Sequence, residues 1–205
     1  MIQSSTAARP AFKYLLVNKP KGVVTTPDAR GRSSVLELVP YSLRADGLRP
    51  SGRLDADASG LMLITDDREF AQQLAHGSLG VTAEYRATVA GLASDEQLKK
   101  LRDGMYLSTP TAEGTTTRRA AMESVRILKR YVDRARGDRT ALSIVLREGQ
   151  NREIRRMFAR VGLKLRELER IAIGPLRTGD LKPGQAKLIK KRDVDRLRAT
   201  MLGSD

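Results

Sequence analysis

A short loop followed at once by an apolar run constrains the fold of this chain more than any other feature. The loop reads Gly52-Arg53-Leu54-Asp55-Ala56-Asp57-Ala58-Ser59-Gly60, and the run is Leu61-Met62-Leu63-Ile64-Thr65. A brief apolar run bounded by turn residues is typical of a buried β-strand. Such a strand would hold Asp55 rigidly, as a reactive group must be held. The same residues also suit an ordinary turn in which an aspartate hydrogen-bonds its own backbone.

The remaining patterns include both strand-like and helix-like segments, and together they predict an α+β fold. Strands are expected at residues 13–17, 85–90, 120–128 and 140–147, and a polar loop at 108–118. Helices are expected at residues 66–75, 94–104 and 151–161 and from Asp193 onward. We expect a disordered tail at residues 1–12 and one domain at 13–205, built of two halves at about 13–80 and 81–205.

The segment 151–161 has the clearest amphipathic pattern. One face carries Ile154, Met157, Phe158 and Val161, and the other carries Arg152, Arg156 and Arg160. Arg155 follows Ile154 by about 100° around the helix axis and falls at the border between the two faces. A guanidinium in that half-buried position suits contact with a buried carboxylate.

Composition excludes several kinds of site. The 205 residues include no cysteine and one histidine, His76, so disulfides, thiolate metal sites and histidine metal clusters are not available. We interpret His76 as structural, at the end of a predicted helix. Catalysis would have to use carboxylate, tyrosine, lysine or arginine side chains. No apolar run approaches the ~20 residues of a membrane span, and the first ten residues lack a secretion signal, so a cytoplasmic protein is expected.

The charge is unevenly distributed. The formal net charge is +14, and residues 101–205 carry 25 Lys and Arg against 13 Asp and Glu. Such an excess favours a polyanionic partner, although it also serves solubility. Part of it lies at 131–139, a basic turn between two predicted strands. The turn could lie along an RNA backbone or be solvated, and the sequence leaves both open.

Several motifs together resemble those of the pseudouridine synthases of the RsuA family, which modify ribosomal RNA. The resemblance rests on the Asp55 loop, on Asn18-Lys19-Pro20-Lys21-Gly22, on Glu148-Gly149-Gln150-Asn151-Arg152-Glu153-Ile154-Arg155-Arg156-Met157, and on Leu168-Glu169-Arg170-Ile171-Ala172-Ile173-Gly174-Pro175-Leu176. The motifs occur in the family's order and cover roughly residues 13–190. The resemblance implies a mostly antiparallel mixed central sheet with flanking helices, in two α+β halves that share one catalytic cleft.

The resemblance also implies roles for individual residues. It places Asp55 as the catalytic aspartate, Arg155 as the basic residue that pairs with it, and Tyr85 as the ring that packs on the target base. Leu168 would line the uracil pocket, although an apolar strand residue is more simply core. The expected RNA-binding residues are Lys19, Lys21, Arg53, Arg152, Arg156 and Arg160. Asp57 is expected to shape the loop. No metal or cofactor is expected, and the partner would be ribosomal RNA or an assembly intermediate, bound by a monomer.

Two departures from the family pattern concern RNA recognition. Ala83 stands where relatives commonly have lysine, two residues before Tyr85. Only about twelve residues precede Lys13, so we expect a short form without the small N-terminal RNA-binding module, similar to members that act on large-subunit ribosomal RNA. Two other readings stay open at this point. They are a non-catalytic RNA-binding or ribosome-assembly factor, and a carboxylate-based glycosidase or nuclease, which would need a second placed acid or a metal.

Overall fold

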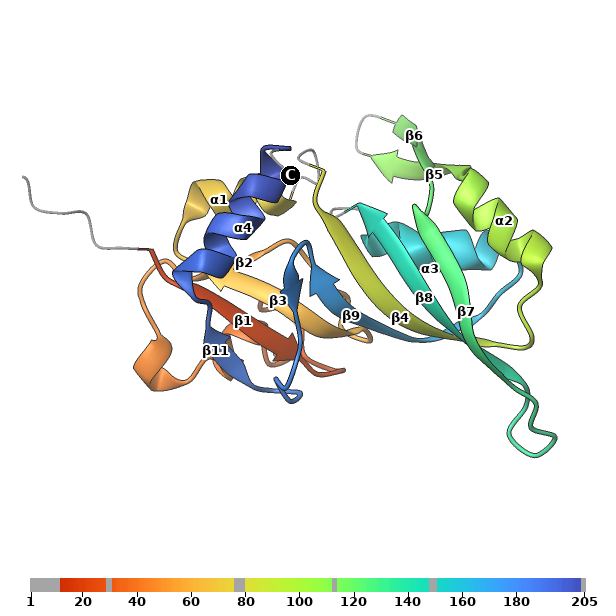
Figure 1. Ribbon diagram of the computed structural model, residues 1–205, viewed down its shortest axis with the longest axis horizontal. Helices are drawn as coiled ribbons and strands as arrows, with labels where there is room; N and C mark the ends of the chain where they lie inside the picture. The colour runs from red at the N-terminus through yellow and green to blue at the C-terminus, as the bar shows by residue number, and fades with distance from the viewer. Residues whose placement is uncertain (1–11, 29–30, 76–79, 112–113, 148–150, 204–205) are drawn as a thin grey trace, which may run out of the picture.

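The structure is a computed structural model that describes residues 12–28, 31–75, 80–111, 114–147 and 151–203 (Figure 1). The helices are α1 (Arg68–Ala75), α2 (Asp95–Asp103), α3 (Asn151–Arg160) and α4 (Lys191–Met201), with short 3-10 turns η1 (Val35–Leu38) and η2 (Tyr41–Leu43). The strands are β1 (Tyr14–Lys19), β2 (Arg49–Ser51), β3 (Ser59–Thr65), β4 (Thr82–Ala90), β5 (Met105–Thr111), β6 (Gly114–Ala120), β7 (Ser124–Tyr131), β8 (Arg139–Arg147), β9 (Leu165–Ile173), β10 (Leu176–Arg177) and β11 (Ala186–Leu188). His76 and residues 1–11 of the predicted tail lie outside the described residues.

One mixed sheet organises the described part of the chain. Its strand order is β11-β1-β3-β9-β4-β8-β7, with β2 also paired to β3 and β10 to β9. The β3–β9 pair is parallel, and the other pairs are antiparallel. This confirms the α+β class and the mostly antiparallel mixed sheet. None of the helices in the described segments is long and apolar enough to cross a membrane.

The first half of the sheet is buried on both faces. In β3, Leu61 and Leu63 belong to one hydrophobic cluster, whereas Met62 and Ile64 belong to another. Successive side chains of a strand point to opposite faces, so a strand covered on both sides reads as a continuous apolar run. The first cluster includes residues of α1 and α4, and β11 pairs with β1. The end of the chain therefore returns to the half where it began (Figure 1).

The second half of the sheet is covered on one face only. Along β4, Ala83, Tyr85, Ala87 and Val89 are buried, while the residues between them are partly or fully exposed. The buried face packs against residues of α2 and α3, including Leu98, Leu101, Ile154 and Phe158. The apolar spacing that predicted the 151–161 helix is therefore explained by this contact.

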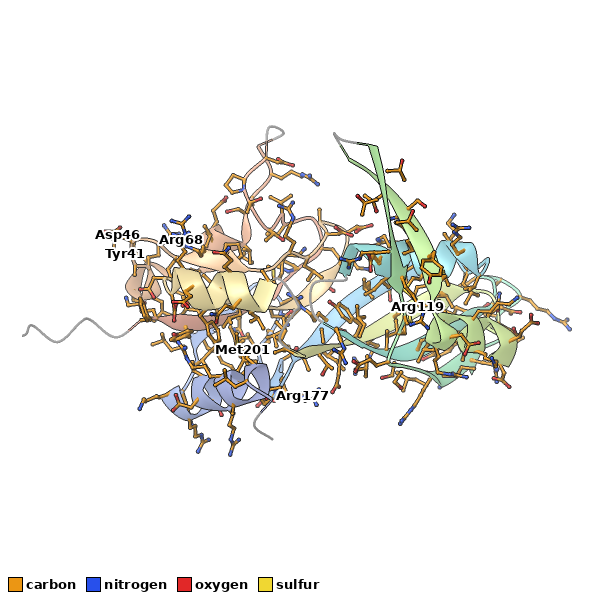
Figure 2. The ribbon with its side chains drawn as sticks, turned by 90° about the horizontal axis from the view of Figure 1, so that it is seen from above. Tyr41, Asp46, Arg68, Arg119, Arg177 and Met201 are labelled. Atoms are coloured by element: carbon orange, nitrogen blue, oxygen red, sulfur yellow. The ribbon has the colours of Figure 1, made fainter. Side chains whose placement is uncertain are left out.

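The predicted polar loop at 108–118 is wrong. Its residues form most of a hairpin, β5–β6, which is a separate two-stranded sheet. The hairpin rises from the body beside α3 in Figure 2. Threonine favours extended backbone, but the described side chains of β6 are exposed on both sides until Ala120. The alternation that identifies a half-buried strand is therefore missing from the sequence.

A polar network ties the C-terminal helix to the body. The buried Asp67 carboxylate accepts hydrogen bonds from Tyr14 Oη at 2.6 Å, Arg198 at 2.8 Å and the Phe70 amide at 3.0 Å. Burial raises the pKa of Asp67, but these hydrogen bonds and the Arg198 charge outweigh it and lower that pKa below its usual value. Burial and the Asp67 hydrogen bond raise the pKa of Tyr14 to about 12.

We expect Asp67→Asn to lower the free energy of unfolding at pH 7 by about 1–3 kcal/mol, because Tyr14, Arg198 and the Phe70 amide lose a charged acceptor at a buried position. A carboxyl with a depressed pKa stabilises the fold above its unfolded pKa, and this contribution is lost as pH falls through the folded value. The deficit should therefore shrink below about pH 4. Urea unfolding at pH 7 and below about pH 4 measures this deficit in the free energy of unfolding. The control is Asp195→Asn, at an exposed residue of α4. A deficit that does not change with pH would contradict the ionic origin.

Candidate active site

The Asp55 loop is held by the segment that follows β1. Thr25 Oγ1 accepts a hydrogen bond from the Leu54 amide at 3.0 Å and donates one to the Leu54 carbonyl at 2.8 Å. The Gly22 amide donates to the Ala56 carbonyl at 2.7 Å. The first two motifs of the sequence are therefore in direct contact, and the backbone on both sides of Asp55 is fixed.

Lys19, which the sequence analysis expected to bind RNA, completes this support from inside the protein. Its side chain is fully buried, with 0% exposure, so it is not available to RNA at the surface. Its Nζ donates to the carbonyls of Pro20, Val23, Ala56 and Ala58 at 3.1, 2.8, 3.4 and 2.6 Å. Burial lowers the pKa of Lys19 to about 8, while the charges of Asp57 and Asp55 act in the opposite direction. A buried ammonium thus lies beneath the loop that carries both aspartates.

Arg155 reaches the Asp55 loop from α3. Its Nε lies 3.9 Å from Asp55 Oδ2, and one terminal nitrogen lies 2.7 Å from Asp57 Oδ2. The Arg155 side chain is 30% exposed, that of Asp55 39% and that of Asp57 66%. The half-buried position predicted for Arg155 is confirmed. Asp57, expected only to shape the loop, takes the closer contact with this guanidinium.

Tyr85 and Leu168 lie in the core beneath the loop. They belong to the same hydrophobic cluster as Leu54 and Ala58, which flank the aspartate, and Ile154 of α3. Tyr85 on β4 is 0% exposed and Leu168 on β9 is 2% exposed. In the protein without RNA, both side chains therefore serve to pack the core. Contact of the Tyr85 ring with a base stays a prediction, and it requires the cover over the ring to move.

The other residues predicted to bind RNA differ in their surroundings. Arg53 is exposed beside Asp55, and Lys21 is exposed with its Nζ 3.3 Å from Glu167. Arg156 donates to Thr109 Oγ1 at 2.9 Å and to the Ser108 carbonyl, so it attaches the β5–β6 hairpin to α3. Arg160 is exposed where α3 meets the β5–β6 hairpin, with a terminal nitrogen 3.5 Å from the Tyr106 carbonyl oxygen. The Arg152 side chain lies outside the described residues.

Arg170 is a buried cation that the sequence analysis did not single out. It is 0% exposed on β9, and its Nε donates to the Leu61 carbonyl at 2.7 Å. A Cβ on Gly60, which has φ of +112°, would lie 2.2 Å from the Arg170 carbonyl oxygen. Glycine therefore allows β3 and β9 to approach closely beneath the loop. In the sequence, Arg170 appeared only as part of the motif at 168–176, and the resemblance implied no function for it.

The arrangement suits carboxylate chemistry on a bound nucleotide. A fixed, partly exposed carboxylate beside a guanidinium can act as a nucleophile or a general base. Among the described residues, no group of three or more histidine, aspartate or glutamate side chains is placed to hold a metal ion. A second carboxylate, Asp57, is nearby, but it contacts the same arginine.

The contribution of the Tyr85 ring can be measured with two substitutions. Stacking of a base on an aromatic ring contributes ~1–3 kcal/mol. We therefore expect Tyr85→Leu to lower kcat/KM for RNA by about 5- to 150-fold and Tyr85→Phe, which keeps the ring, to lower it less than about fivefold. Circular dichroism of both variants controls for the loss of a core side chain. Equal losses in the two variants, with both folded, would refute a stacking role.

Comparison with known proteins identifies the class to which this fold and site belong. The family model for RNA pseudouridylate synthase matches residues 13–160, and the chain belongs to that family. It is therefore an isomerase that acts on RNA. The resemblance noted in the sequence is confirmed at the level of the family.

Individual relatives agree with this assignment. The chain is 34% identical to the ribosomal large subunit pseudouridine synthase B of Bacillus subtilis, over 91% of this chain and 71% of that protein. It is 31% identical to the protein of the same name from Pseudomonas aeruginosa, over 95% of this chain and 48% of that protein. A crystal structure of a pseudouridylate synthase has the same fold, with a TM-score of 0.71 over 91% of this chain and 74% of that one, at 22% identity.

Proposed function

We propose that this protein converts a specific uridine of large-subunit ribosomal RNA to pseudouridine, with Asp55 as the essential carboxylate. The observation that carries the proposal is the placement of Asp55. The loop is fixed by Thr25 and Lys19, and the carboxylate faces Arg155 with part of its surface open. The names of the relatives from Bacillus subtilis and Pseudomonas aeruginosa support large-subunit ribosomal RNA as the substrate.

The reaction is an isomerisation. The bond between ribose C1′ and uracil N1 breaks, the base turns within the site, and C1′ bonds to C5. The proton on C5 is lost and N1 gains one, so no redox partner or cosubstrate is needed. Asp55 would attack C1′ or the base, or take the C2′ proton to give a glycal. Arg155 would hold the carboxylate and balance its charge before substrate binds.

The target base has to leave its stack to reach Asp55. Extrusion of a base costs a few kcal/mol, which stacking and phosphate contacts have to supply. Arg53 and Lys21 are exposed beside the loop and are proposed to contact the RNA there. Arg160 is a further candidate on α3, whereas Arg156 is proposed to act through the β5–β6 hairpin that it holds. We expect the protein to act as a monomer in the cytoplasm, on ribosomal RNA or an assembly intermediate.

Two other functions are less well supported by the site. A glycosidase or nuclease needs a second acid with its own role, but Asp57 shares Arg155 with Asp55. A requirement for a metal ion would revive a nuclease. A non-catalytic ribosome-assembly factor needs RNA binding but not Asp55, so its cellular effect would survive Asp55→Ala.

Site mapping of pseudouridine by carbodiimide labelling and primer extension tests the proposal. Large-subunit ribosomal RNA would be compared between cells with and without this protein, and between rescue by wild type and by Asp55→Ala. We expect one pseudouridine to disappear in the deletion strain and to return only with the wild type. If a site missing from the deletion strain returns with Asp55→Ala, the proposed carboxylate is wrong. If purified protein forms no pseudouridine on this RNA, the substrate is wrong.

A further inference from the structure

The exposed face of the second half of the sheet is strongly basic. Across three neighbouring strands, Arg86 of β4 is in register with Ser143 of β8, and Ser143 with Arg126 of β7. The opposite face of the same strands packs on α2 and α3. Figure 1 shows β4, β8 and β7 lying uncovered in front of α3. The basic face is therefore turned away from the side on which α3 presents Arg155 to Asp55.

A hollow of about 660 Å³ lies on this face, at the base of the β7–β8 turn. Its lining includes Arg86, Arg136, Arg139 and Arg166, the Tyr131 ring, and the acids Asp138 and Glu167. Both acids already have partners. Glu167 lies 3.3 Å from the Lys21 ammonium, and Asp138 Oδ1 accepts a hydrogen bond from the Asp133 amide at 3.0 Å.

Of the four arginines that line the hollow, only Arg86 forms an ion pair among the described residues. Arg139 stacks on the Tyr131 ring at 4.7 Å, and Arg86 lies 3.6 Å from Glu169. Within the described part of the chain, Arg136 and Arg166 form no ion pair. The turn that carries Arg136 is fixed, because Asp133 Oδ1 accepts from the Ala135 and Arg136 amides at 3.0 Å. The hollow thus presents unneutralised cations on a defined framework.

We propose that this hollow, which we call the β7–β8 hollow, binds the phosphate backbone of an RNA segment distant from the target uridine. Segment 124–147 carries seven Lys and Arg against two Asp, and both aspartates are engaged in the turn itself. A face that served solubility alone would intersperse both signs. Guanidinium groups match phosphate in geometry and charge, and a concave basic surface concentrates a polyanion.

The inference rests on the proposed function, and it defines the substrate more closely. The β7–β8 hollow faces away from α3, and its Glu167 end meets Lys21 beside the Asp55 loop. RNA bound at the target therefore reaches Arg136 and Arg166 only if it continues past Lys21 along the exposed face of the sheet. The protein should therefore bind a folded ribosomal RNA more tightly than the isolated target hairpin. The gain should come from phosphate contacts and depend on salt, because each contact releases counterions.

The test compares two double variants with the same change of charge. Arg136→Gln with Arg166→Gln removes two cations of the hollow that have neither an ion pair nor an aromatic partner among the described residues. Arg68→Gln with Arg196→Gln is the control, on exposed residues of α1 and α4. Arg68 lies at the far end of the molecule from the β7–β8 turn, as Figures 1 and 2 together show. The probes are a full-length large-subunit ribosomal RNA transcript of Bacillus subtilis and a hairpin of about 20 nucleotides around the mapped uridine.

We expect the hollow variant to raise Kd for the transcript by ~10-fold at about 100 mM salt and to reduce the salt slope of log Kd by about 1–2. Its Kd for the hairpin and both affinities of the control variant should change less than twofold. Unchanged affinity and slope for the transcript would overturn the proposal, as would equal losses on transcript and hairpin. If wild type binds the transcript but forms no pseudouridine, the proposed function fails, while the binding comparison still decides the role of the hollow.

Discussion

Asp55→Asn is expected to abolish pseudouridine formation while RNA binding persists. The amide is nearly the same size as the carboxylate, so the loop held by Thr25 and Lys19 should keep its shape. It cannot act as a general base, and it is a poor nucleophile. General acid or base groups contribute ~10²–10⁴-fold to a rate, so we expect a loss of at least ~10²-fold in single-turnover assays. Filter binding should show less than a ~3-fold change in Kd, because few phosphate contacts are altered.

Asp57→Asn is the matched control for this experiment. Asp57 lies in the same loop, contacts the same Arg155 at 2.7 Å, and loses the same charge. Its side chain is 66% exposed, and exposed ion pairs contribute at most ~1 kcal/mol, so a loss of less than about fivefold is expected. If Asp57→Asn lowers the rate of pseudouridine formation more than Asp55→Asn does, Asp57 and not Asp55 is the essential carboxylate.

Lys19→Met is expected to have the largest effect on stability. Methionine has a similar length and shape, but it removes the Nζ donor from the carbonyl oxygens of residues 20, 23 and 58, whereas the Ala56 carbonyl keeps the Gly22 amide. Unsatisfied buried groups cost ~1–3 kcal/mol each, and the removed cost of burying an ammonium offsets part of this. We expect a net loss of roughly 2–4 kcal/mol in the free energy of unfolding, measured by urea denaturation at pH 7.

Lys19 should also make the free energy of unfolding depend on pH. The direction is opposite to that of a lysine in an ordinary ion pair, whose stabilising contribution is lost as pH rises. The pKa of Lys19 is lowered to about 8, so the folded protein releases this proton before the unfolded chain does. The contribution of wild-type Lys19 to the free energy of unfolding should therefore rise between about pH 8 and the ordinary lysine value near 10.4, and this rise should be absent in Lys19→Met. Lys21→Met, at an exposed lysine two residues away, should change stability by less than about 0.5 kcal/mol. Equal destabilisation by the two substitutions would contradict the buried role of Lys19.

Motif and periodicity were sufficient for the elements that pack on the core. The apolar run at 61–65 predicted β3, and the spacing of Ile154, Met157 and Phe158 predicted both α3 and the border position of Arg155. These predictions succeed because the spacing of apolar residues along the chain follows the period of the strand or helix that they form. The hairpin β5–β6 lacks such a pattern. It is held by contacts with α3 through Arg156, and by Arg118 with Glu153, which no local signal shows.

Lys19 illustrates why charge in the sequence was misleading. A lysine beside a proline and a second lysine resembles an exposed basic motif, but only one of the two lysines is at the surface. Lys19 ends β1 at a position where the Asp55 loop closes over it, and the loop comes from residues more than thirty positions further along the chain. Burial of a charge depends on these distant carbonyls, so the residue type did not reveal it.

By itself, the sequence determined the class of fold, the family and the rigid loop that carries Asp55, because these depend on local periodicity and on motifs read in order. The tertiary structure decided which charged groups meet. It placed Arg155 closer to Asp57 than to Asp55, buried Lys19 and Arg170 beneath the loop, and assembled the β7–β8 hollow from four strands and a turn. The physical reason is that electrostatic and hydrogen-bond partners are set by distance in space, and residues far apart in the chain become neighbours only when the sheet is formed.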